Sequence, residues 1–180
     1  MTSDKIKLLK MFQNIKSING RVKLQKIVFL LQQLAKKNSA GNPFTYTFFY
    51  HNHGPFSKEL AEEITYIDNH YGYILEYQKN DSNIWVYENN IKDKENQLLN
   101  NYHFEDIFGI SESDFNRTID KLNDYGYELL ESTATIVYLV NKGNFGQDKE
   151  KLRAKLNELK PHLNDLFEEA FKLAQEYFIN

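Results

Sequence analysis

The stretch that most constrains the fold lies between residues 44 and 60 and reads FTYTFFYHNHGPFSKEL. Residues 45–50 are all β-branched or aromatic, which favours a β-strand. Gly54-Pro55 then marks a turn, and Ser57 suits the N-cap of a helix because its hydroxyl can accept from a backbone N–H in the first turn. Apolar residues follow at helical spacing at Leu60, Ile64, Ile67 and Tyr71. The stretch therefore predicts a strand–turn–helix connection with a structural role, and it does not indicate a catalytic site.

Composition and charge exclude several classes of protein. The chain has no cysteine, which excludes disulfides and zinc–thiolate sites and is typical of a protein of the reducing cytoplasm. Charged residues interrupt the N-terminal segment and every apolar run is short, so we expect no signal peptide and no association with a membrane. With 180 residues and a net charge of −3, the chain can bury a sizeable core and does not have the charge of a general nucleic-acid binder.

The charge is unevenly distributed along the chain. The first 37 residues contain nine lysines or arginines and one acidic residue, Asp4, so they could form a basic patch that attracts anions. The alternative is that two lysine-rich helices expose ordinary solvated faces. The residues that would form a basic face for a protein or nucleic-acid partner are Lys10, Lys16, Arg21, Lys23 and Lys26.

The order of the predicted elements in residues 1–90 is that of a winged helix. Two helices precede the strand, a third helix begins after Ser57, and a small β-hairpin follows. The expected ranges are 3–15 and 21–37 for the first two helices, and 73–77 and 84–87 for the hairpin strands. In the second helix, the residues expected to face outward are Lys23, Lys26, Gln33 and Lys37. The residues expected to be buried together are Leu24, Ile27, Val28, Leu31, Phe48, Leu60, Ile64 and Trp85.

The second half of the chain is predicted to be helical. Residues 91–110 are rich in polar side chains and indicate a linker or a weakly structured segment. A capping-box-like sequence begins a helix at Ser111, and residues 129–140, in which Glu131 is the one charged residue, indicate a buried central helix. Residues 111–180 therefore form a helical, helix-turn-helix-like subdomain. The predicted fold class is α+β, mainly helical, with a winged-helix-like N-terminal half that carries a small β-hairpin and a helical C-terminal half.

Several short motifs give the chain a family resemblance. A Leu-Gln-Lys helix precedes an aromatic strand and a His-Gly-Pro-Phe-Ser corner, and residues 130–139 and 158–161 match further on. In these features the chain resembles the YwgA-like proteins, which look like distant relatives of the Panacea (SocA-like antitoxin) domains. The resemblance leaves only the linker near 90–110 unmatched, and it implies a winged-helix-like fold. The positions that carry it, with an expected structural role, are Leu24, Gln25, Lys26, Tyr46, Phe48, His53, Gly54, Pro55, Phe56 and Ser57.

No arrangement of residues in the sequence indicates catalysis. His51 and His53 would share one face of a strand, but the spacing supplies no third ligand, so we expect neither a metal nor a cofactor. Gly54-Pro55 belongs to no phosphate-binding loop or nucleophile elbow, and Ser57 is better explained as a helix cap. We therefore predict no catalytic residue and no enzymatic activity.

Two functions remain for a chain of this kind. The first, which the Panacea-like resemblance implies, is a non-enzymatic regulatory or adaptor protein, antitoxin-like, that acts through contacts with a protein partner. The alternative is a winged-helix DNA-binding transcriptional regulator that uses the basic face of the first two helices. The helix after Ser57 would be the recognition helix, but it carries Lys58 against four carboxylates, which favours the protein partner. The sequence leaves open whether the chain forms a homodimer.

Overall fold

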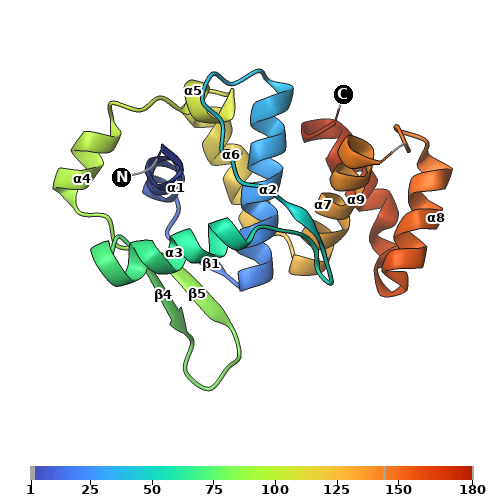
Figure 1. The fold of residues 1–180 in the computed structure, drawn as a ribbon, viewed down its shortest axis with the longest axis horizontal. Helices are drawn as coiled ribbons and strands as arrows, with labels where there is room; N and C mark the ends of the chain where they lie inside the picture. Colours follow the sequence, from blue (N-terminus) through green and yellow to red (C-terminus); the bar gives the residue numbers. More distant parts are fainter. Residues whose placement is uncertain (1–2, 144, 180) are drawn as a thin grey trace.

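The computed structural model describes residues 3–143 and 145–179 and has a mainly helical α+β fold, as predicted (Figure 1). The helices are α1 (Ser3–Gln13), α2 (Arg21–Lys37), α3 (Lys58–Tyr71), α4 (Asp93–Leu99), α5 (Phe104–Phe108), α6 (Glu112–Asp124), α7 (Tyr127–Lys142), α8 (Lys149–Leu159), the 3₁₀ helix η1 (Pro161–Leu166) and α9 (Phe167–Tyr177). The strands are β1 (Ser17–Asn19), β2 (Phe49–His51), β3 (Gly54–Phe56), β4 (Ile74–Gln78) and β5 (Trp85–Asn89).

Two small antiparallel sheets accompany the helices. One has the strand order β1-β5-β4, in which Ile18 pairs with Tyr87. The other is the β2–β3 hairpin, in which His51 pairs with Gly54. The predicted hairpin is present as β4 and β5, whereas β1 was not indicated by the sequence because three residues are too few for a periodic pattern.

The helix α2 lies at the centre of the molecule. In Figure 1 it runs between α1, α3 and the β4–β5 hairpin on one side and α7, α8 and α9 on the other. Every residue from Leu24 to Ala35 is buried, and most of the first three turns of α7 are buried as well. One hydrophobic core contains side chains from both halves of the chain. The division into residues 1–90, 91–110 and 111–180 stays a prediction.

Two details of the core differ from the sequence prediction. Trp85 is only partly buried, and its ring is covered by the guanidinium of Arg21, whose central carbon lies 3.6 Å from the ring centroid. The segment 91–110 carries α4 and α5, because Phe104, Ile107 and Phe108 are spaced for one helical face and are buried. The remaining residues that were expected to be buried together are buried.

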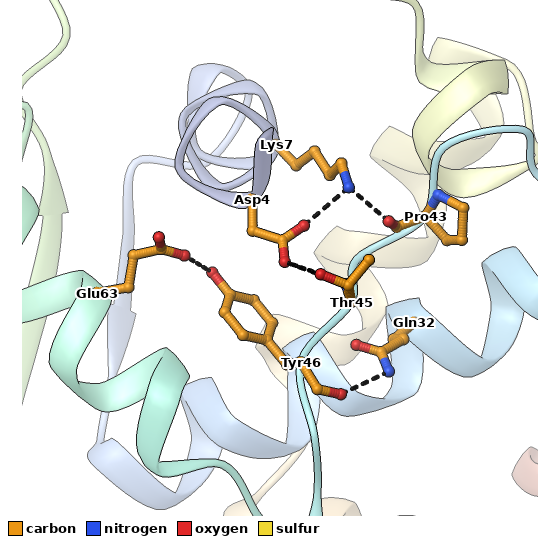
Figure 2. A network of polar contacts seen from close by, with 7 residues as sticks. All are labelled: Asp4, Lys7, Gln32, Pro43, Thr45, Tyr46 and Glu63. Atoms are coloured by element: carbon orange, nitrogen blue, oxygen red, sulfur yellow. Dashed lines mark hydrogen bonds and ion pairs between the residues drawn. The ribbon is translucent and has the colours of Figure 1, made fainter. Parts of the chain in front are cut away.

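The segment before β2 is extended but pairs with no strand, although the sequence predicted a strand from Thr45. Side chains of α1 hold its backbone instead, as Figure 2 shows. The ammonium of Lys7 donates to the carbonyl oxygen of Pro43 at 2.6 Å, and the Asp4 carboxylate accepts from the Thr45 N–H at 3.2 Å. These contacts satisfy backbone groups that a neighbouring strand would otherwise satisfy, so the ladder begins only at Phe49.

Helices α2 and α3 hold the same segment one residue further along (Figure 2). The side-chain amide of Gln32 donates to the carbonyl oxygen of Tyr46 at 3.0 Å, and the Tyr46 hydroxyl donates to Glu63. Burial, followed by this hydrogen bond, raises the pKa of Tyr46. The extended segment is thus fixed between three helices before it enters β2.

The corner after β2 differs in part from the prediction: the turn falls on Asn52-His53, and Gly54-Pro55, predicted as the turn, lies in strand β3, while the predicted Ser57 cap is present. Ser57 caps α3, with its hydroxyl accepting from the Leu60 N–H at 3.3 Å, and Ser111 caps α6 in the same way. Gly54 has φ +78, a conformation that other residues rarely adopt. A Cβ at this position would also lie 2.8 Å from the Thr135 hydroxyl of α7, so only glycine fits.

We predict that Gly54→Ala destabilises the protein more than Gly72→Ala does. Both glycines have positive φ, so each alanine costs about 1–2 kcal/mol of backbone strain. A Cβ at Gly72 meets nothing within 4 Å, whereas at Gly54 the contact with Thr135 adds about 1–3 kcal/mol of overpacking. Urea unfolding of both variants measures the difference, and equal losses of stability would contradict the close contact between the corner and α7.

Candidate functional site

Two neighbouring side chains of α2 bind the backbone of the Gly54 corner. Gln25 donates from its amide nitrogen to the carbonyl oxygen of Ser57 and accepts from the Ser57 N–H, both at 2.9 Å. Lys26 donates from its ammonium to the carbonyl oxygen of Pro55 at 2.6 Å. All three bonds are buried, so the corner has one position relative to α2.

A buried group of charges attaches the other side of the corner to α7 and to Lys160, the residue between α8 and η1. Glu131 of α7 forms an ion pair with Lys160, and each side chain is only 2% exposed. The Lys160 ammonium also donates to the carbonyl oxygen of Asn52, and the second carboxylate oxygen of Glu131 lies 3.3 Å from Nδ1 of His53. The corner is therefore held from both halves of the chain.

The charge of Lys26 depends on these neighbours. Burial lowers the pKa of Lys26 to about 7, the Glu131 carboxylate opposes this shift, and the Lys160 ammonium adds to it. The buried group thus contains two lysines and one carboxylate. Near neutral pH, Lys26 is divided between its charged and neutral forms, and both forms can donate to Pro55.

A pocket of about 330 Å³ opens on the outer side of the corner. Its volume lies at the lower end of the range of pockets that bind small molecules or single side chains. Its apolar walls come from α2, from β3 and from α3, and consist of Val22, Leu24, Phe56, Ala61 and Ile64. The arrangement suits the insertion of an apolar group.

The rim of this pocket is polar and carries the carboxylate of Glu76, whose negative charge is largely compensated by its neighbours. Glu76 accepts from the Tyr87 hydroxyl at 3.1 Å and from the Thr65 hydroxyl at 2.9 Å, and its carboxylate oxygen lies 3.8 Å from Nε of Arg21. The Arg21 side chain is 57% exposed and that of Glu76 only 11%. Burial, followed by the Glu76 charge, raises the pKa of Tyr87. Of the two charges at the rim, that of Arg21 is consequently the more exposed.

The five residues predicted to form a basic face do not form one. Lys16 and Arg21 are exposed and Lys23 is partly buried, but Lys10 is 4% exposed and Lys26 is 1% exposed. The prediction that Lys26 faces outward is therefore wrong. A partner that reaches the surface of α1 and α2 meets Lys16, Arg21 and part of Lys23, and a binding role for these stays a prediction.

The burial of these side chains has a clear physical cause. Lys26 turns inward because the carbonyl oxygen of Pro55 and the Glu131 carboxylate lie on that side of α2. The Lys10 ammonium lies 4.5 Å from the ring centroid of Phe104 on α5. Gln33, also expected outside, is buried as well. The periodicity of apolar residues within a helix cannot reveal that a segment later in the chain packs over one of its polar side chains and buries it.

The resemblance motifs converge on the corner, with two exceptions. Leu24, Gln25, Lys26 and residues 53–57 lie together, while Tyr46 and Phe48 lie in the extended segment before β2. Sequence reasoning did not assign Glu131, Lys160, Glu76 or Tyr87 to the site, although Glu131 and Lys160 lie in the resemblance stretches 130–139 and 158–161. A signal existed for Glu131, since it is the one charged residue in an otherwise uncharged helical stretch.

His51 and His53 both line the pocket, but in different environments. The His51 ring lies 5.5 Å from the ring of Phe56, whereas His53 reaches Glu131. Across residues 3–143 and 145–179, no three histidine, aspartate or glutamate side chains are grouped closely enough to hold a metal ion. Over the same ranges, no helix has the length and apolar character needed to cross a membrane.

The helices and the two small antiparallel sheets define a mainly helical α+β protein. No family model matches the chain. The chain is 26% identical over 176 residues to a protein of Bacillus subtilis (strain 168) named "Uncharacterized protein YwgA", and the match covers 98% of this chain and 97% of that protein. This similarity supports the YwgA-like resemblance over nearly the whole chain, and the relationship to the Panacea domains stays a prediction.

We predict that the stability of the protein rises with pH between about 7 and 10.5 because of Lys26. The ordinary pKa of the lysine is 10.5 and the folded value is about 7, so within this window the unfolded chain binds a proton that the native chain has lost. The cost of burying the charged lysine is fully present below pH 7 and is relieved as the pH rises. Urea unfolding at several pH values measures this contribution as the difference between the wild type and Lys26→Met.

The matched control is Lys94→Met, which removes an exposed lysine on α4. The free-energy difference between the wild type and Lys26→Met should increase with pH, while the difference for Lys94→Met should stay constant. Parallel stability curves for the wild type and Lys26→Met would show that Lys26 is not held in a buried site.

Proposed function

We propose that this chain is a non-enzymatic regulatory protein that binds a protein partner, and that the partner inserts an apolar side chain into the pocket at the Gly54 corner. The observation that carries this proposal is the pocket itself, of about 330 Å³, with apolar walls from α2, β3 and α3. A pocket of this kind accepts the buried anchor residue of an interface.

The corner that forms the pocket is rigid before any partner arrives. Gln25 and Lys26 fix the backbone of Pro55 and Ser57, and Gly54 packs closely against α7. A preformed site avoids the entropy loss of ordering a loop on binding, and this favours recognition of a short segment.

The rim indicates the chemistry of the partner. Arg21 is the exposed partner of the Arg21–Glu76 ion pair at the rim, and the less exposed Glu76 carboxylate also accepts hydrogen bonds from Tyr87 and Thr65. Charge complementarity then favours a partner segment that carries aspartate or glutamate beside its apolar anchor. The positive charge of Arg21 would repel a partner segment that carries lysine or arginine.

The DNA-binding alternative has less support. The helix α3, which would be the recognition helix of a winged helix, carries Glu59, Glu62, Glu63 and Asp68 against Lys58. Phosphate neutralisation supplies much of the affinity for DNA, and such a helix repels phosphates.

The Panacea-like resemblance favours an antitoxin-like role in the cytoplasm, in which this chain neutralises or presents its partner, alone or as a homodimer.

We predict that filling the pocket weakens partner binding. Ala61 lines the pocket on α3, so Ala61→Leu places a larger side chain in the space that the anchor would occupy. Random peptides displayed on phage, selected on the wild type, should converge on an apolar residue flanked by aspartate or glutamate. The selected peptide should bind Ala61→Leu at least about tenfold more weakly, a loss of roughly 1.4 kcal/mol.

The control is Ala154→Leu, the same change at an exposed alanine of α8. It should bind the selected peptide as the wild type does, and Arg21→Glu should weaken binding through the acidic flank. Selection of no consensus, or a peptide that binds Ala61→Leu unchanged, would exclude the pocket as the docking site. A duplex DNA sequence bound tightly at physiological salt would establish the DNA-binding alternative instead.

A further inference from the structure

A second pocket, of about 550 Å³, lies where the last turns of α2 and α7 meet the extended segment before β2. Lys36 and Lys37 enter it from α2 and Lys142 from α7. No aspartate or glutamate side chain lines it within the described ranges of the chain. The whole protein has a net charge of −3, so this concentration of positive charge is a local feature.

The three lysines do more than balance the ends of their helices. A helix C-terminus carries roughly half a negative charge, so two helix ends leave part of three ammonium charges uncompensated. Lys37 donates to the carbonyl oxygen of Ile179 at 2.9 Å. Within residues 3–143 and 145–179, the ammonium groups of Lys36 and Lys142 have neither a hydrogen-bond nor an ion-pair partner.

Lys36 and Lys142 also repel each other. Burial lowers the pKa of Lys36, and the Lys142 charge across the pocket lowers it further. Two like charges facing one space raise the energy of the empty pocket. An anion with two negative charges between them would remove this repulsion.

The other walls suit an organic molecule rather than a bare ion. The ring of Phe29 lies 5.1 Å from that of Phe48 and 6.3 Å from that of Tyr138, and all three line the pocket. Asn141 donates to Gln33 at 3.1 Å, which places two side-chain amides beside the lysines. The pocket therefore combines a cationic end with an aromatic wall.

We propose that this second pocket binds a small organic dianion, a phosphate monoester or a dicarboxylate, whose charges lie between Lys36 and Lys142 and whose ring or apolar part packs on the aromatic wall. The site is separate from the pocket at the Gly54 corner, and its lining residues are different. The proposal does not depend on the proposed partner binding.

Phenyl phosphate and phthalate are suitable probes, because each carries a ring and two negative charges. Each is titrated into the ¹⁵N-labelled protein at constant ionic strength, with chloride as the balancing anion. Saturable shifts of the Gln33 and Asn141 side-chain amides are expected. The double variant Lys36→Gln, Lys142→Gln should weaken binding at least about tenfold, since charge-assisted hydrogen bonds are lost.

The matched control is the double variant Lys79→Gln, Lys94→Gln, which removes two exposed lysines elsewhere. It should leave the affinity within about twofold of the wild type, because distant surface charges are screened. Tighter binding of phenyl phosphate would identify the ligand as a phosphate monoester, and tighter binding of phthalate as a dicarboxylate. Absence of saturable binding by both probes, or an equal loss in the control variant, would overturn the proposal.

Discussion

The hydrogen bonds between α2 and the Gly54 corner are the contacts on which the rest of the arrangement depends. Gln25 and Lys26 bind the backbone of Ser57 and Pro55, and this fixes where β3 ends and where α3 begins. The direction of α3 in turn sets the walls of the pocket beside the corner. Without Gln25 and Lys26, the buried carbonyl groups of Ser57 and Pro55 would lose their hydrogen-bond donors, which would cost free energy. The corner therefore depends on these two side chains of α2.

The buried charges add specificity to this contact at some expense in stability. Lys26, Glu131 and Lys160 come from three different elements, and the two lysines share one carboxylate. Apolar side chains of similar volume often stabilise a protein as well as a buried ion pair does. What the ionic group provides is one defined position of the corner relative to α7, because charged groups tolerate few alternative partners in a core.

The two pockets differ in chemistry because different elements form them. The pocket at the corner has apolar walls and one exposed rim charge, whereas the pocket between the ends of α2 and α7 has three lysines and aromatic walls. Both border the polypeptide between Tyr46 and Phe56, which side chains of α2 and α3 hold in place. The proposed partner and the proposed anion would therefore bind to a prepared framework and need no folding of a loop.

Local interactions determined what could be predicted from the sequence. The period of the apolar residues predicted α2 over residues 21–37, and the hydroxyls of Ser57 and Ser111 identified the starts of α3 and α6, because these effects act within one helical turn. The corner was recognised for the same reason. Only the tertiary structure decided that Lys26 points inward, since its partner at Pro55 lies 29 residues further along the chain. It likewise decided that Thr45 is held by Asp4 instead of a neighbouring strand, because the competing hydrogen-bond donors and acceptors come from elements distant in sequence.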